Sequence, residues 1–228
     1  MIYYQRRCMG ETTSIANWLK SEIERAVAMI DKRDRIREEI FRLSREVIRC
    51  SGRAVTYLNA MDLSKAVAEI NSCASHVENL VRVSKNEEDL IRYGLPLQAF
   101  IEYCEAIYLL AVIGGKVEDS LARYCIEEAP PEARLLAIGD LTGEIKRHAV
   151  NLIAEWRVED AEAFVKIMKD IYSWVKYLDY PDSLVPGFRH KVDVMRRSIE
   201  DLEVLLAETI TKRELINRLE DLKRGIPG

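Results

Sequence analysis

The stretch FRHKVDVMRRSIEDLEVLLAETI, residues 188–210, decides the fold class. Its apolar residues recur every three or four positions, which is the period of an α-helix with one face turned to a core. They are Val192, Met195, Ile199, Leu202, Leu206 and Ile210. The pattern predicts a long last helix over about 188–224.

The same period fills the rest of the chain. It appears in Ile15, Leu19, Ile23, Val27 and Ile30, and again in Ile36, Ile40, Leu43 and Val47. These residues predict one long first helix over about 13–61. Further helices are expected over about 62–84, 86–112, 117–127, 130–156 and 158–178, and Pro96 should kink or split the third. With 10 Gly and 6 Pro, the chain has too few turn residues for a strand-and-turn protein.

We therefore predict an all-α protein, an antiparallel bundle of about seven helices with a long first helix, because short connections make neighbouring helices antiparallel. A flexible N-terminus, residues 1–12, should precede a single helical domain, residues 13–224. The first helix would measure about 75 Å. That length exceeds a compact domain of 228 residues, so part of it should pack against another subunit.

Composition limits the possible functions. The net charge of −4 does not indicate a nucleic-acid binder, so any RNA contact must come from a local patch. No apolar run approaches the roughly 18 residues of a membrane span, and the N-terminus lacks the apolar core of a signal peptide. Five widely spaced cysteines without a C-x-x-C motif predict reduced thiols and a cytoplasmic location.

Two acidic pairs stand out in apolar or glycine-containing helices. Glu102 and Glu105 are three residues apart and share a helix face, although their neighbours are apolar. A bound cation would offset their repulsion, and a solvated helix edge would also explain them. Asp140 and Glu144 are four apart, and each is preceded by a glycine at 139 or 143. The glycines indicate the close approach of a backbone or a substrate, or else tight helix packing with two exposed acids.

Four carboxylates on two facing helices would make an oxygen-rich site that suits Mg²⁺ or Mn²⁺. Such an ion can polarise a phosphodiester and lower the pKa of a bound water. A carboxylate that is not fully used by the metal could act as a general base. Other chemistries lack support, because the sequence contains no H-E-x-x-H motif and no glycine-rich phosphate loop.

A basic face on the first helix is the third feature. Eight Lys or Arg and four acidic residues lie between Lys32 and Arg53. Five arginines fall on one face, namely Arg35, Arg42, Arg45, Arg49 and Arg53. Such a face can hold phosphates along a nucleic-acid strand. The alternative is a solvated face with ion pairs such as Glu38–Arg42, or Glu46 with Arg49 and Arg53.

These segments resemble the translin family. Residues 42–47 (RLSREV) resemble a K/R-L-S-R-D/E-hydrophobic stretch of the long first helix, and residues 102–106 (EYCEA) an E-Y-x-E-A segment of the factor X subunit. Residues 138–147 (IGDLTGEIKR) resemble its G-x-x-D-L-T-G-E block, which is the most specific match. Residues 191–198 (KVDVMRRS), followed by Glu203, resemble the last-helix pattern. The order is that of the family, and the matches span most of the chain.

The resemblance implies a closed, shell-like homo-oligomer, eight subunits by first expectation and six by second. It implies that single-stranded RNA, or single-stranded DNA, binds inside and that the factor X type cleaves RNA with Mg²⁺. The metal-binding and catalytic residues would be Glu102, Glu105, Asp140 and Glu144. Lys146 and Arg147 follow the acidic block and could hold the strand. The connection between the two acidic pairs is shorter than in animal relatives, which would suit an archaeal protein working without a paralogous partner.

The leading hypothesis is a Mg²⁺-dependent endoribonuclease. The rival is a non-catalytic oligomer that binds single-stranded RNA or DNA and keeps a vestigial acidic cluster. A purely structural helical oligomer is the third hypothesis. None of the three involves a membrane.

Overall fold

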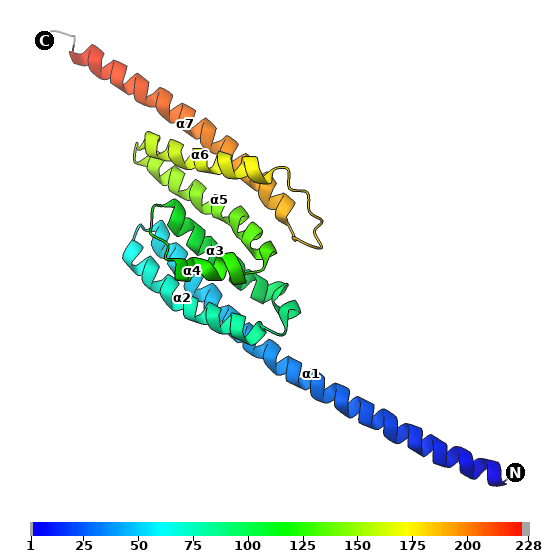
Figure 1. The fold of residues 1–228 in the computed structure, drawn as a ribbon. Helices are drawn as coiled ribbons and strands as arrows, with labels where there is room; N and C mark the ends of the chain where they lie inside the picture. Colours follow the sequence, from blue (N-terminus) through cyan, green and yellow to red (C-terminus); the bar gives the residue numbers. More distant parts are fainter. Residues whose placement is uncertain (1, 225–228) are drawn as a thin grey trace.

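A computed structural model describes the backbone of residues 2–224, and the side chains of residues 14–223 except Glu88. Within this range the chain forms seven α-helices and no strand, so the predicted all-α fold with seven helices is confirmed (Figure 1). The helices are α1 (Ile2–Asn59), α2 (Leu63–Ser84), α3 (Gly94–Val112), α4 (Asp119–Arg123), α5 (Pro131–Ala154), α6 (Val158–Val175) and α7 (Phe188–Arg224). Two single turns complete them, the 3₁₀ turn η1 (Glu88–Ile91) and the π turn η2 (Tyr124–Glu128).

The helices pack in two groups that meet at α3 and α5. The first group joins α1 to α2 and α3, and the second joins α5 to α6 and α7. Figure 1 shows α3 and α5 side by side in the middle of the molecule, where one group passes into the other. Any side chain on the facing surfaces of α3 and α5 is therefore held by helices of both groups.

Helix α3 is the apolar centre of the fold. By length and composition alone it could cross a membrane, so the expectation that no apolar run approaches this length is wrong for α3. Its residues are mostly buried against α1 and α5, which is the position of a core helix. Glu102 and Glu105 are the acidic residues of this helix, and both lie on it within the packed centre.

Several helix ends carry residue types that favour helix termini. Asp62 caps α2 by accepting a hydrogen bond from the backbone N–H of Lys65 at 3.2 Å, and Pro131 opens α5. Gly114, with φ of 85°, follows the end of α3. Pro96 was expected to kink or split the helix over about 86–112. This segment is divided into η1 and α3, but the break lies at residues 92–93, before Pro96, and α3 begins at Gly94. Pro96 thus lies in the first turn, where its missing N–H breaks no helical hydrogen bond.

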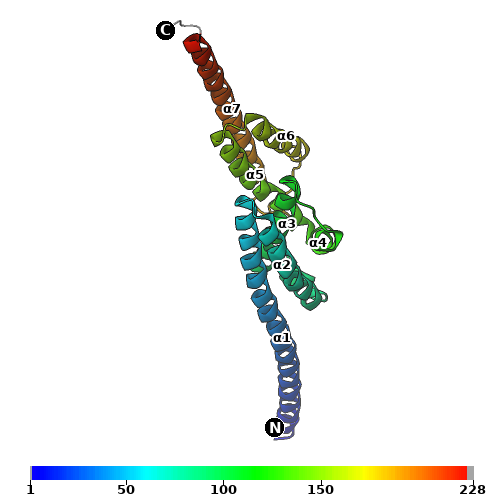
Figure 2. The ribbon, with the colours of Figure 1, turned by 90° about the vertical axis from the view of Figure 1, so that its left-hand side faces the viewer.

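Helices α1 and α7 extend beyond the body in opposite directions (Figures 1 and 2). The apolar residues predicted for the first helix form a stripe along α1, and its later half is buried, with Ile40, Leu43 and Val47 at most 3% exposed. The earlier half is not covered, since Ile23 and Ile30 are 63% and 66% exposed. The predicted flexibility of residues 1–12 stays a prediction, because their side chains lie outside those described.

Two cysteines differ from the expectation of reduced thiols. Cys50 of α1 and Cys73 of α2 form a disulfide, with Cα atoms 5.5 Å apart, so the expectation is wrong for this pair. The two are 23 residues apart in the chain, and only the packing of α1 against α2 brings them together. Cys104 and Cys125 are free and buried in the core, as expected. Cys8 lies outside the described side chains.

Candidate functional site

The four predicted carboxylates come together where α3 faces α5. Glu102 and Glu105 project from α3, and Asp140 and Glu144 from α5. The negative charges of the other three carboxylates all act on Glu105, so the four share one electrostatic environment. We call this cluster the acidic centre. It combines two pairs that are 35 or more residues apart in sequence.

Glu105 is the buried member of the acidic centre, with 9% of its surface exposed. Burial raises its pKa to about 8, and the negative charges of Asp140, Glu102 and Glu144 add to the shift, while Lys191 opposes it. Among the described residues, no side chain donates a hydrogen bond to its carboxylate. Glu105 therefore holds a proton near neutral pH, or requires a cation that the chain itself does not supply.

The other three carboxylates each have a donor. Gln98 Nε2 donates to Glu102 Oε1 at 2.8 Å, one helical turn away on α3. Lys191 Nζ of α7 forms an ion pair with Asp140 Oδ1. The donors to Glu144 are Asn59 Nδ2 at 2.7 Å and Arg147 Nε at 3.2 Å. The acidic centre is thus partly compensated from α1, α3, α5 and α7.

Asn59, the last residue of α1, is a site residue that sequence reasoning missed. Its amide nitrogen holds Glu144, but its carbonyl oxygen Oδ1 is buried without a hydrogen-bond partner. An unsatisfied buried acceptor costs about 1–3 kcal/mol. No motif surrounds Asn59 in the sequence, so only the packing of α1 against the bundle reveals it.

Lys191 is the second site residue that sequence reasoning missed. Gly139 was the feature of the sequence that could have indicated a close neighbour at this point of α5. A Cβ atom on Gly139 would lie 2.7 Å from Lys191 Cδ and 2.8 Å from Lys191 Cβ, so the aliphatic stem of the lysine occupies the space that a side chain would take. The close approach of a backbone or a substrate predicted at Gly139 is not what the structure shows: a side chain of α7 lies there, which agrees with the alternative of tight helix packing. Gly143 differs, because a Cβ there would meet nothing within 4 Å.

The chemistry of the acidic centre fits a divalent cation. Its carboxylates, and the orphaned Oδ1 of Asn59, are the hard oxygen donors that Mg²⁺ and Mn²⁺ prefer. Burial and the charges of three neighbouring carboxylates raise the pKa of Glu105, and a cation beside it would favour its charged form. As the side chains stand, no three His, Cys, Asp or Glu among the described residues converge closely enough to hold a metal ion. Side-chain movements, including that of Lys191, would have to accompany metal binding.

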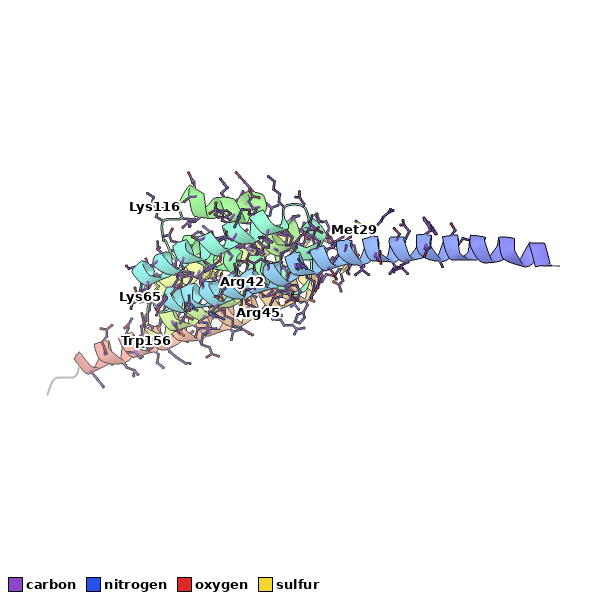
Figure 3. All side chains as sticks on the ribbon, turned by 90° about the horizontal axis from the view of Figure 1, so that it is seen from below. Met29, Arg42, Arg45, Lys65, Lys116 and Trp156 are labelled. Atoms are coloured by element: carbon purple, nitrogen blue, oxygen red, sulfur yellow. A yellow bond between two sulfur atoms is a disulfide. The ribbon has the colours of Figure 1, made fainter. Side chains whose placement is uncertain are left out.

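The five arginines of α1 divide into two sets. Arg42 is held by Glu39 at 2.8 and 2.7 Å, Arg49 by Glu46 at 3.0 Å, and Arg53 by Glu69 of α2 at 2.9 Å. The ion pair expected between Glu38 and Arg42 is wrong, because Glu38 pairs with Arg37. Arg35 and Arg45 are exposed, and neither has an ion pair in the described part of the chain. Figure 3 shows the side chains along this part of α1, with Arg42 and Arg45 labelled.

The two basic residues after the acidic block also have partners. Arg147 reaches back to Glu144 and is 62% exposed, so it lies at the rim of the acidic centre. Lys146 instead pairs with Asp201 of α7 at 2.7 Å. Arg147 is therefore the better placed of the two to contact a strand beside the carboxylates. A cavity of about 530 Å³ between α2, η2 and the start of α5 shares no lining residue with the acidic centre.

The fold is that of a translin-type all-α protein. Comparison with known proteins agrees: residues 126–208 match the Translin family, and this translin-family segment contains Asp140, Glu144 and Lys191. The resemblance to the family is thus confirmed.

Solved structures share the architecture over most of the chain. AfC3PO is 25% identical with a TM-score of 0.74, covers 84% of this chain and 98% of its own, and has been solved by itself and in complex with duplex RNA. The apo form of NeC3PO is 18% identical with a TM-score of 0.68, over 82% of this chain and 96% of that one. An uncharacterised protein of Methanocaldococcus jannaschii is 23% identical over 203 residues, which are 87% of this chain and 89% of that protein.

Proposed function

We propose that this protein is a metal-dependent endoribonuclease that cleaves single-stranded or flexible RNA. The observation that carries the proposal is the acidic centre, in which three carboxylates, those of Glu102, Asp140 and Glu144, act on the buried Glu105. Similarity to AfC3PO, which has been solved with duplex RNA, supports RNA as the ligand. Because that ligand is a duplex, both single-stranded and duplex RNA belong in the test.

Glu102, Glu105, Asp140 and Glu144 would hold Mg²⁺ or Mn²⁺. When bound there, the ion would polarise the phosphodiester and lower the pKa of a water molecule. The residues of the chain have separate tasks. Glu105 holds a proton near neutral pH in the metal-free protein, and it would have to release that proton before its carboxylate could hold the ion. Asn59 holds Glu144 in place, and Arg147 at the rim can bind a phosphate of the strand.

We propose further that the protein acts as a homo-oligomer, with eight subunits as the first expectation and six as the second. The exposed apolar side chains on the free part of α1 support this, because such a stripe normally packs against another surface. A closed assembly would also separate Arg35 and Arg45 from the negative charge of the outer surface.

RNA cleavage with and without Mg²⁺ tests the enzymatic proposal. Wild-type protein should cleave only with the metal, and Glu105→Gln or Asp140→Ala should slow cleavage at least about 10²-fold. Glu128→Gln, an exposed acid in η2, is the matched control and should cleave at the wild-type rate. Equal rates for all four proteins, or cleavage in EDTA, would reject the proposal.

The rival function is an RNA- or DNA-binding oligomer without catalysis. The ion pair between Lys191 and Asp140 favours it, because that pair already compensates one carboxylate without a metal. The rival predicts that RNA binds with the same affinity in EDTA and in Mg²⁺, and that it stays intact in both.

A further inference from the structure

We propose that Lys191 is the internal counter-cation of the acidic centre. Its ammonium group holds the Asp140 carboxylate while no divalent cation is bound, and it leaves Asp140 when one binds. The proposal rests on the proposed metal site and adds a residue of α7 to it. Lys191 and a divalent cation would thus compete for the same carboxylate.

The position of the ion pair supports this role. Lys191 lies in the first turn of α7, and Nζ reaches across to Asp140 on α5. The two side chains are 27% and 31% exposed, whereas most ion pairs of this protein have at least one partner more than 40% exposed. The pair is therefore less exposed to water than those ion pairs, although it is only partly buried.

Helix α5 has a glycine where the stem of Lys191 crosses it. The stem of Lys191 lies over Gly139, the residue before Asp140, at distances that any Cβ atom would prevent. A glycine inside a helix is unfavourable by itself, so its presence at this position is explained by the space that it leaves. An exposed surface lysine would need no such space. Lys191 thus supplies the cation, and the absence of a side chain at Gly139 leaves the space in which the lysine stem reaches Asp140.

The charges of the acidic centre give the reason for competition. Glu102, Glu105, Asp140 and Glu144 face two cations, Lys191 and Arg147. Lys191 also stabilises the charged form of Glu105, so its ammonium lies close to more than one carboxylate. A divalent cation among these carboxylates would repel a neighbouring ammonium, and more strongly in this partly buried place than at a fully exposed surface. The lysine stem, which is flexible and partly exposed, can swing the ammonium into solvent.

Titration of the metal-free protein with Mn²⁺, followed by calorimetry, tests the competition. Lys191→Met keeps the unbranched stem over Gly139 and removes only the charge. It should raise the affinity for Mn²⁺ about tenfold or more, which is the size of effect that one neighbouring charge has on the protonation of a carboxylate. Lys212→Met, an exposed lysine of the same helix paired with Glu208, should leave the affinity unchanged.

A pair of glycine variants tests whether the packing of the Lys191 stem against Gly139 positions its ammonium group. Gly139→Ala places a methyl group against the Lys191 stem, which should push the ammonium from Asp140 and also raise the affinity for Mn²⁺. Gly143→Ala makes the same change one turn later, where the added Cβ meets nothing within 4 Å, and should bind Mn²⁺ like the wild type. Circular dichroism of each variant confirms that it is folded.

The outcomes separate this proposal from the enzymatic one. Unchanged or weaker Mn²⁺ binding by Lys191→Met overturns the counter-cation role, and so does the absence of binding in both wild type and variant. Tighter binding supports the role even if wild-type protein leaves RNA intact in Mg²⁺. In that case the metal site stands, and only the ribonuclease is rejected.

Discussion

Glu105 carries an ionisable group in the most apolar helix of the protein. Its neighbours on α3 pack into the core, and its carboxyl group meets three other carboxylates and one lysine. Burial and like charge act in the same direction, so both favour the protonated form. This one residue therefore links the stability of the metal-free fold to pH.

The metal-free protein should lose stability as the pH rises. The pKa of Glu105 is about 8 in the folded protein, against an ordinary value of 4.5. The stabilisation from its bound proton is therefore complete below about pH 4.5 and is lost as the pH rises through about 8. Thermal denaturation in EDTA should show a falling melting temperature over this window. Glu105→Gln cannot titrate and should flatten the fall, and an equally steep fall in that variant would contradict the assignment.

Asn59 provides a second prediction at the level of one residue. Its side-chain amide nitrogen donates a hydrogen bond to Glu144, and this bond comes from α1 rather than from α5 itself. Residues that orient metal ligands in this way typically contribute 10- to 100-fold to metal affinity. Asn59→Ala should therefore weaken Mn²⁺ binding by about that factor. Asn71→Ala is the control, because Asn71 is exposed on α2 and bonds only to the backbone of its own helix. Equal Mn²⁺ affinity in both variants would remove Asn59 from the site.

At the level of the element, α1 combines two surfaces. One face builds the core through Ile40, Leu43 and Val47, and the other carries the arginines. Ion pairs within α1 and with α2 already occupy Arg42, Arg49 and Arg53, which leaves Arg35 and Arg45 as the arginines that can bind phosphate without breaking a pair. Of the five arginines that the sequence places on the basic face, only two are therefore available for phosphate.

This division predicts a graded effect on RNA binding. Each phosphate contact changes the slope of log affinity against log salt by about 0.7 for a single strand. Arg45→Ala should lower the slope by about that amount and weaken binding to all sequences alike. Arg42→Ala should change it less, because Glu39 already holds that guanidinium. Binding titrations at several salt concentrations measure both slopes, and no change for Arg45→Ala would place this face away from RNA.

At the level of the whole molecule, the helical bundle leaves apolar residues of α1 and α7 exposed. The free part of α1 exposes Ile23 and Ile30, and the far part of α7 exposes Leu219 and Leu222. Figures 1 and 2 show that these parts extend away from the body on opposite sides. Both stripes have the helical period that normally faces another helix, which favours contact with further copies of the chain.

Light scattering at micromolar concentration should therefore show a closed homo-oligomer. Ile23→Asp with Ile30→Asp should produce a smaller species with unchanged helix content, because both side chains are exposed in the single chain and do not support its core. Lys32→Asp changes the opposite side of α1 and should leave the assembly intact. A wild-type species of 26.3 kDa would refute the proposed oligomer.

The sequence alone determined the helices of this protein and the acids of its candidate site. Apolar residues at a period of three or four, with Asp62, Gly114 and Pro131 at helix ends, predict the elements because helix formation depends on neighbours a few residues away. The same local spacing placed Glu102 with Glu105, and Asp140 with Glu144, on shared helix faces. It misplaced the interruption of the third segment, which was expected at Pro96, whereas α3 starts two residues before that proline.

Only the tertiary structure decided which partners these acids have. Asn59, Lys191 and the Cys50–Cys73 disulfide join segments that are 23 to 85 residues apart, and no local pattern announces them. The glycine at 139 was visible in the sequence, but its cause, the stem of Lys191, belongs to another helix. The pKa of Glu105 likewise depends on burial and on charges from α5 and α7. Such properties arise from the packing of helix against helix, which local periodicity does not specify.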